Sequence, residues 1–154
     1  WPMYLLEKGN STNNKKINKK KYKENFKNSL NEILKNGNKI LLIYPIPEVG
    51  WNPKRRLLNM SFFIKSRIDE LLKENFISTS YDVYLKRTKE TFELYDSIKH
   101  KNLIRVYPDK LFCNTKKLNR CIINEDNIIY YYDDDHLSLD GSKKLFDRIT
   151  KEIN

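Results

Sequence analysis

Stretches of helical periodicity alternate along this chain with short apolar runs. In residues 22–35 apolar side chains recur every three or four positions, which predicts an amphipathic helix. The Asn36-Gly37-Asn38 sequence that follows is typical of a helix C-cap. Similar spacing predicts helices over 66–75 and 80–99, the second of them with core positions at Val83, Leu94 and Ile98.

The apolar runs predict strands. Residues 39–46 are almost continuously apolar and are ended by prolines, which is typical of a buried parallel strand. Residues 103–107 and 128–131 predict two further strands. Residues 9–21 are rich in Asn and Lys and predict a flexible polar loop, whereas residues 52–62 give no clear pattern. This helix–strand alternation predicts an α/β fold with a parallel sheet.

Composition limits the classes of protein that fit. The chain has 154 residues, of which 39% are hydrophobic, so we expect one globular core and no membrane-spanning run. Its net charge of +10 suggests a polyanion partner. However, the absence of Ala and Gln and the excess of Lys, Asn and Ile are typical of an AT-rich coding bias. We therefore expect no nucleic-acid partner, although the Lys-rich run at 15–23 could face an anionic glycan or lipid headgroups.

The strongest chemical signal lies near the C-terminus, in Asp133-Asp134-Asp135-His136-Leu137-Ser138. An acid three residues before a histidine can hold one ring nitrogen and leave the other free as a base, which gives two members of a Ser-His-Asp triad. Ser138 is placed to cap a closing helix, whose apolar stripe consists of Leu145, Ile149 and Ile153. We expect Asp134 and Asp135 to be solvated turn residues.

These groups, and two others that can carry chemistry, also have simpler interpretations. A histidine with three acids can hold a cation, but the spacing departs from a calcium loop because Leu137 stands where an oxygen ligand is expected, so we predict no metal. His100 lies between two lysines and is expected at the surface. The two cysteines, Cys113 and Cys121, are either free thiols or a disulfide, since no Cys or His completes a zinc site.

Three motifs together resemble a known family. They are Asp-x-x-His-Leu-Ser before a last helix, a strand running into Pro45-Ile46-Pro47-Glu48, and Leu111-Phe112-Cys113 followed by Cys121. The combination resembles the SGNH/GDSL hydrolase superfamily. Within it, the chain is similar to the SGNH domain fused to family-3 membrane acyltransferases, the O-acyltransferases of bacterial cell-surface glycans. The similarity extends over nearly the whole chain.

The resemblance implies a flavodoxin-like three-layer α/β/α fold and a disulfide between Cys113 and Cys121. A disulfide implies an oxidising compartment, here the periplasmic or extracytoplasmic face of a bacterial inner membrane. No Gly-Asp-Ser block occurs in the sequence. The resemblance therefore implies that residues 1–154 are the C-terminal part of one SGNH domain, with the first strands and the serine nucleophile upstream, and that this chain alone is inactive.

The implied reaction is O-acyl transfer, with acetyl as the expected group. Asp133 would orient His136, and His136 would act as the base; no cofactor is expected. The acyl donor would come from a membrane acyltransferase domain, and the acceptor would be lipopolysaccharide, peptidoglycan or exopolysaccharide; water as acceptor would make an esterase. Trp1, Pro47 and Glu48 are candidate substrate-binding residues, although the proline could simply end a strand. The alternative is a non-catalytic or truncated module that binds a glycan or supports the membrane domain.

Overall fold

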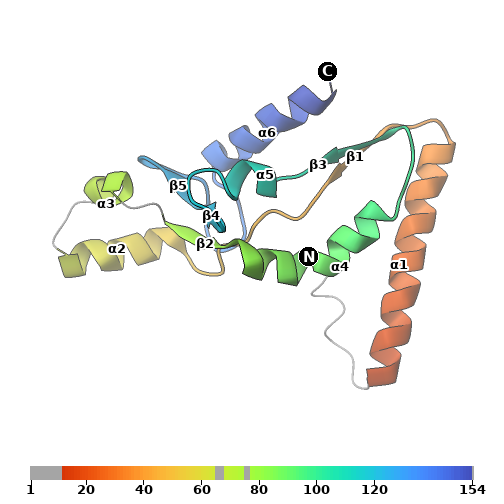
Figure 1. Ribbon diagram of the computed structural model, residues 1–154, viewed down its shortest axis with the longest axis horizontal. Coiled ribbons are helices and arrows are strands. Elements are labelled where there is room, and N and C mark those ends of the chain that lie inside the picture. The colour runs from red at the N-terminus through yellow and green to blue at the C-terminus, as the bar shows by residue number, and fades with distance from the viewer. Residues whose placement is uncertain (1–11, 65–67, 75–76, 154) are drawn as a thin grey trace.

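A computed structural model describes residues 12–64, 68–74 and 77–153 (Figure 1). The helices are α1 (Thr12–Lys35), α2 (Pro53–Ile64), α3 (Ile68–Glu74), α4 (Tyr81–Asp96), α5 (Asp109–Phe112) and α6 (Leu139–Ile153). The strands are β1 (Ile40–Ile43), β2 (Ser78–Ser80), β3 (Leu103–Val106), β4 (Arg120–Ile122), β5 (Asn124–Glu125) and β6 (Ile128–Ile129). In the described part of the chain, no helix is both long and apolar enough to cross a lipid bilayer.

Strands β1 and β3 pair in parallel, with Ile40 opposite Leu103 and Ile43 opposite Val106. Helices α1 and α4 supply apolar side chains to this pair, and α6 also packs against β3. The alternation of helices with parallel strands confirms the predicted α/β class. The first hydrophobic cluster, here called the helix–strand cluster, has these buried members: Leu34, Leu42, Tyr44, Ile98 and Leu103.

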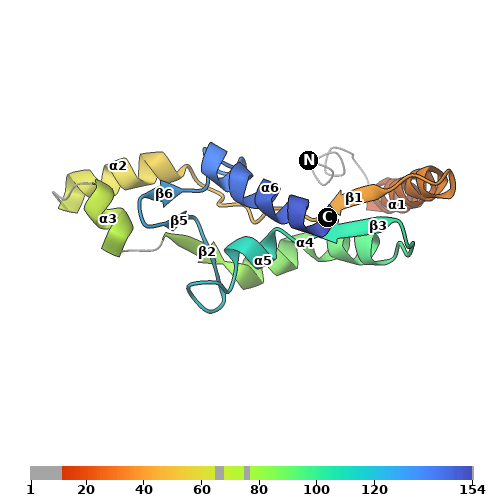
Figure 2. The same ribbon diagram turned by 90° about the horizontal axis from the view of Figure 1, so that it is seen from above.

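The remaining strands are shorter and antiparallel. β2 pairs with β4 and β5 pairs with β6, and each of these four strands has only two or three residues. They enclose a second cluster, here called the disulfide-side cluster, whose buried members are Val49, Phe112, Cys113, Cys121, Ile122, Ile123, Tyr130 and Tyr131. Figures 1 and 2 show this part, with β2, β4, β5 and α5, at one end of the β1–β3 pair, away from α1.

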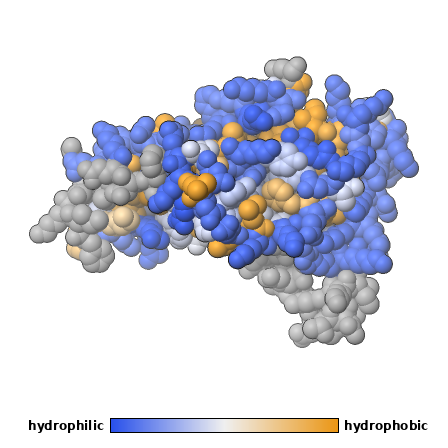
Figure 3. Space-filling view, in the orientation of Figure 1, coloured by the Kyte–Doolittle hydropathy of each residue, from blue (hydrophilic) through white to orange (hydrophobic). Residues whose placement is uncertain are grey.

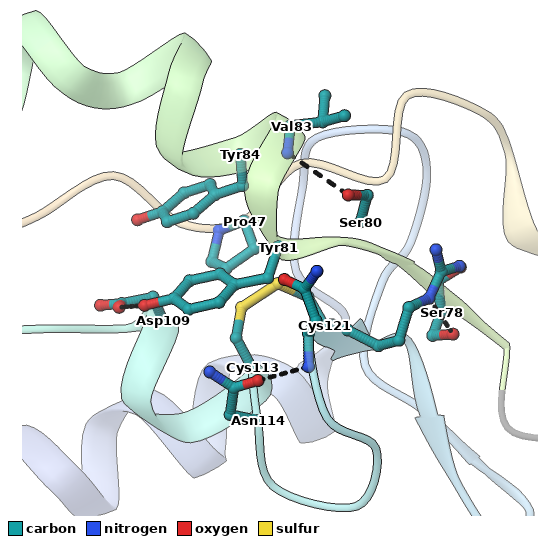
Figure 4. The surroundings of a disulfide bond; sticks show 12 residues. Pro47, Ser78, Ser80, Tyr81, Val83, Tyr84, Asp109, Cys113, Asn114 and Cys121 are labelled. Atoms are coloured by element: carbon teal, nitrogen blue, oxygen red, sulfur yellow. Dashed lines mark hydrogen bonds between the residues drawn. A yellow bond between two sulfur atoms is a disulfide. The ribbon is translucent and has the colours of Figure 1, made fainter.

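The two cysteines form a disulfide, as the family resemblance implied (Figure 4). Their Cα atoms are 3.8 Å apart, which is closer than the usual range of roughly 4.4–6.8 Å. The residues also form an antiparallel bridge, which brings the two backbones together at this point. Asn119 in the enclosed loop donates its side-chain amide to Asp82 of α4, and Lys116 pairs with Glu125 of β5. The loop is therefore attached to two further elements.

Two predictions about the helices need correction. Residues 12–21 were predicted to form a loop, but α1 begins at Thr12; residues 9–11 lie outside the described part. Lys19 and Lys23 of α1 both reach Glu90 of α4, at 2.5 and 3.1 Å, and such tertiary ion pairs are invisible in the local sequence. Val83 is 53% exposed rather than a core residue, whereas Leu94 and Ile98 are buried as predicted. The unassigned stretch after Asn52 forms helix α2.

Helix α6 fixes the segment that carries the candidate chemistry. Gly141 N–H donates to Ser138 Oγ at 3.2 Å, which confirms the predicted cap. A Cβ atom at Gly141 would lie 2.1 Å from the carbonyl oxygen of Tyr130, so only glycine allows this close approach. Of the predicted stripe, Leu145 is buried and Ile149 is half-buried, but Ile153 is exposed. Figure 3, in the orientation of Figure 1, shows that this face of the molecule is mainly hydrophilic.

Candidate active site

The candidate site is a closed loop between Tyr131 and Leu137. These two residues form an antiparallel bridge, and Tyr132 N–H donates to the carbonyl oxygen of His136 at 2.9 Å. Ser138 N–H donates to the carbonyl oxygen of Tyr130, also at 2.9 Å. The three acidic residues therefore lie at the tip of a hairpin-like loop whose base is held by backbone hydrogen bonds.

Asp133 holds both the backbone and the ring of His136. Its Oδ1 accepts the N–H of His136 at 2.8 Å and that of Asp135 at 3.2 Å. Ring atom Nδ1 of His136 lies 3.0 Å from each carboxylate oxygen of Asp133. The contact predicted from the three-residue spacing is therefore present. Because these contacts use Nδ1, the ring nitrogen left for a reacting group is Nε2.

Asp135 also approaches the ring, with its Oδ1 2.9 Å from Nδ1 of His136. The expectation that Asp135 is only a solvated turn residue was therefore incomplete. The spacing of Asp133 and His136 gave a specific signal, but nothing in the sequence distinguished Asp135 from Asp134. Asp133, Asp135 and His136 each place one ligand atom within 4.8 Å of the others. Hydrogen bonding between one imidazole and two carboxylates accounts for this geometry.

The two groups shift each other's pKa in opposite directions. Hydrogen bonds from the backbone of His136 and Asp135 and from the His136 ring lower the pKa of Asp133 to about 2. The hydrogen bond to Asp133, together with the negative charges of Asp133 and Asp135, raises the pKa of His136 above its ordinary 6.5. Asp133 therefore stays ionised at neutral pH. A protonated His136 is stabilised there, which is what a base needs once it has taken up a proton.

The segment after β1 packs directly against this loop. The backbone N–H groups of Val49 and Gly50 both donate to the carbonyl oxygen of Asp134, at 2.8 and 3.0 Å. The buried Tyr131 donates its hydroxyl to the carbonyl oxygen of Pro47 at 2.7 Å. Gly50 has a positive φ of 77°, a conformation that glycine adopts without strain. Two motifs that are far apart in the sequence thus meet at one place.

The predicted substrate-binding residues have different environments. Pro47 is fully buried, so its side chain packs inside the protein and is not exposed to a substrate. Glu48 is half-exposed and pairs with Arg87 of α4 at 2.8 Å, so its carboxylate contacts a helix residue rather than His136. Trp1 lies outside the described residues.

A pair that the sequence analysis did not identify lies beside the loop. Tyr132 is 62% exposed, and Lys54 Nζ lies 4.7 Å from the centre of its ring. Lys54 belongs to the first turn of α2, in the stretch to which no structure was assigned. In the Tyr130-Tyr131-Tyr132 run, the buried Tyr131 is followed by the exposed Tyr132. Alternation of side chains along this run was the only indication in the sequence of an exposed aromatic residue.

The nearest serine in sequence has a structural role. Ser138 Oγ donates to the carbonyl oxygen of Ile129 at 2.7 Å while accepting the N–H of Gly141. Across the residues that the structure describes, no serine hydroxyl is hydrogen-bonded to His136. The described residues therefore bring together an imidazole and a carboxylate that orients it.

Comparison with family models identifies the chain's relatives. A family model described as "SGNH domain (fused to AT3 domains)" matches residues 1–151. No curated protein and no solved structure matches the chain.

Proposed function

Because the chain belongs to the family of SGNH domains that are fused to AT3 domains, and so forms a hydrolase- or acyltransferase-like module, we propose that Asp133 and His136 are the acid and base of a serine-ester mechanism. The observation that carries this proposal is the pair of 3.0 Å contacts between Nδ1 of His136 and the Asp133 carboxylate. This contact fixes the ring and leaves Nε2 to act as the base.

The proposed reaction has two halves. In the first half, Nε2 of His136 takes the proton of a serine hydroxyl as its oxygen attacks the acyl carbonyl, and the protonated ring then gives that proton to the leaving group. In the second half, His136 takes the proton of the acceptor hydroxyl, which attacks the serine ester, and returns it to the serine. A sugar hydroxyl as acceptor gives an O-acyltransferase, and water gives an esterase. Asp133 remains ionised throughout.

The serine is proposed to lie upstream of residue 1, in a Gly-Asp-Ser block. Two observations support this placement. The sequence contains no such block, and the hydroxyl of Ser138 is bound to Ile129 and Gly141 rather than to His136. The donors that stabilise the oxyanion are proposed to come from the same upstream part.

The biological setting is proposed from the fusion and the disulfide. A membrane AT3 domain would deliver the acyl group, and a cell-surface glycan would accept it. The disulfide between Cys113 and Cys121 supports an oxidising compartment, and therefore the extracytoplasmic side of a bacterial membrane. The fusion to a membrane domain and the disulfide thus both favour the extracytoplasmic side.

The test compares this chain with a longer natural protein that includes the upstream Gly-Asp-Ser block. We expect the longer protein to hydrolyse an aryl acetate or transfer its acetyl group, and the 154-residue chain to be inactive. His136→Ala in the longer protein should lower kcat by several orders of magnitude, on the order of 10⁴-fold or more. His100→Ala is the matched control, because His100 lies before β3 and its Nδ1 accepts the N–H of Asn102 at 3.1 Å.

Two results would contradict the proposal. Turnover by the 154-residue chain that is lost on mutating one of its own serines would place the nucleophile within it. Full activity of the His136→Ala variant in the longer protein would show that His136 is not the base. That result would favour an accessory module that binds a glycan or supports the membrane domain.

A further inference from the structure

The register of the loop places Tyr132 beside His136. Tyr131 pairs with Leu137, so Tyr132 and His136 are the next opposite residues, and a hydrogen bond of 2.9 Å joins their backbones. Tyr131 is buried, whereas Tyr132 is 62% exposed and the side chain of His136 is 64% exposed. Tyr132 and His136 therefore project to the solvent side together, and opposite residues of this kind have Cβ atoms about 4.5–5.5 Å apart.

Helix α2 brings a cation to the same place. Hydrogen bonds from Val49 and Gly50 to Asp134 fix the start of this segment on the loop. The first turn of α2 then places Lys54 Nζ 4.7 Å from the centre of the Tyr132 ring. Among the described residues, Lys54 has no salt-bridge partner within 4.0 Å. A lysine next to an exposed ring, and without a carboxylate partner, keeps its charge available to a ligand.

We propose that Tyr132 and Lys54 form an acceptor subsite for a sugar unit that carries an anionic group. This proposal rests on the proposed function, because it assigns the acceptor side of the site that His136 serves. The aromatic ring offers an apolar surface for the C–H face of a sugar, and Lys54 offers a charge for a carboxylate or phosphate on that sugar. A hydroxyl of the bound sugar would then lie next to Nε2 of His136.

The charges around the loop make this assignment selective. Asp133 and Asp135 direct their negative charge to Nδ1 of His136. An anionic sugar placed over the three acids of the loop would be repelled, whereas one placed at Lys54 would be attracted. The anionic group should therefore sit on the α2 side of Tyr132, which orients the sugar in one direction relative to His136.

The experiment measures binding to the complete 154-residue chain by isothermal titration and by NMR shift changes. The probes are trigalacturonate and its fully methyl-esterified form, which differ in charge but share the sugar rings. We expect the acid to bind about two- to fivefold more tightly than the ester, the range of a partly exposed ion pair, and to shift Tyr132 and the residues around it.

Two variants and one control test the residues. Lys54→Gln should remove the preference for the acid over the ester, and Tyr132→Ala should weaken both probes. Lys86→Gln, at an exposed position on α4, is the matched control and should keep the wild-type preference. Equal binding of the two probes, binding of neither, or equal effects of Lys54→Gln and Lys86→Gln would each overturn the subsite.

The result is separable from that of the catalytic test. Binding to this chain does not require a nucleophile, so loss of the charge preference would refute the subsite while His136→Ala could still abolish turnover in the longer protein. Conversely, the charge preference could depend on Lys54 while the His136→Ala variant remained active. That combination would support the subsite and would show that His136 is not the base.

Discussion

The helix–strand cluster and the disulfide-side cluster are built in different ways. The first is assembled from α1, α4 and four-residue parallel strands, and aromatic side chains such as Tyr44, Phe92 and Tyr95 pack edge to face within it. The second has strands of two or three residues and relies on a disulfide and on buried polar contacts. The candidate site lies on the second cluster, so its position depends on cross-links more than on long elements.

Polar contacts in the disulfide-side cluster replace part of what regular structure provides elsewhere. Asn124 is fully buried and uses its side chain to bind the backbone of Ile77, Leu72 and Asp126. Glu125 accepts hydrogen bonds from Lys144 and Tyr130 in addition to its contact with Lys116. These contacts join irregular segments that share few ladder hydrogen bonds. Removing one of these polar contacts should therefore loosen a local region, whereas a cavity in the helix–strand cluster should affect the whole fold.

The largest expected effect tests the helix–strand cluster. Leu34→Ala removes a side chain that is only 1% exposed, and we expect the free energy of unfolding to fall by about 2–5 kcal/mol. Ile33→Ala is the matched control, since Ile33 is 43% exposed and should cost less than about 1 kcal/mol. Urea denaturation measures both. Equal losses for the two variants would show that α1 does not pack as described.

The disulfide gives the next effect. Replacing Cys113 and Cys121 by serine opens a short loop, and we expect a loss of roughly 2–3 kcal/mol in the free energy of unfolding. A reductant should destabilise the natural chain by a similar amount and leave the double variant unchanged. Identical melting of the natural chain with and without reductant would show that the bridge contributes nothing to the disulfide-side cluster.

Tyr131→Phe tests the link between the loop and the segment after β1. The change leaves the carbonyl oxygen of Pro47 without its donor in a buried place, so we expect a loss of about 1–3 kcal/mol. Tyr132→Phe is the control, because Tyr132 is 62% exposed and its substitution should change stability by less than about 0.5 kcal/mol. If the two variants were equally stable, the Tyr131 hydroxyl would not help to hold the loop.

The smallest effect concerns pH. The pKa of Asp133 is lowered to about 2, so its contribution to stability is present above the unfolded value, about 3.9, and is lost as the pH falls towards 2. The pKa of His136 is raised, so its contribution is present below about 6.5 and is lost as the pH rises through the raised value. NMR titration should show a midpoint for His136 above 6.5 that falls in Asp133→Asn.

The same shift sets the expected pH dependence of catalysis. His136 must be neutral to take a proton, so the rate of the longer protein should rise with pH through the raised pKa of His136. Asp133→Asn should move this rise to lower pH as well as lowering the rate. An unchanged midpoint in both the titration and the rate profile would show that Asp133 does not affect the pKa of His136.

The parts that could be predicted from the sequence are those that depend on local spacing. Asp133 and His136 are three residues apart, so one turn brings them together, and the apolar run before Pro45 predicted β1. Ser138 was identified as a helix cap because the apolar stripe began after it. These features need little information from distant parts of the chain, which is why the pattern of residues was sufficient.

The missed features depend on distant contacts. Lys19 and Lys23 of α1 pair with Glu90, more than sixty residues away in sequence. Helix α2 brings Lys54 to Tyr132 from a segment that is bound to Asp134. Val83 occupies an apolar position by spacing, yet α4 presents it to solvent. The strands β2, β4 and β5 have only two or three residues each and are too short to leave a clear period in the sequence.

The loop enclosed by the disulfide has a consequence for proteolysis. Leu118 at its tip is 87% exposed and follows Lys116 and Lys117, so trypsin should cut there first among the described segments. A cut after Lys117 would separate residues 1–117 from residues 118–154, but Cys113 and Cys121 would still join them. The nicked protein should therefore run as one species without reductant and as two with it, and His136 on the smaller piece would stay in place after the backbone is broken.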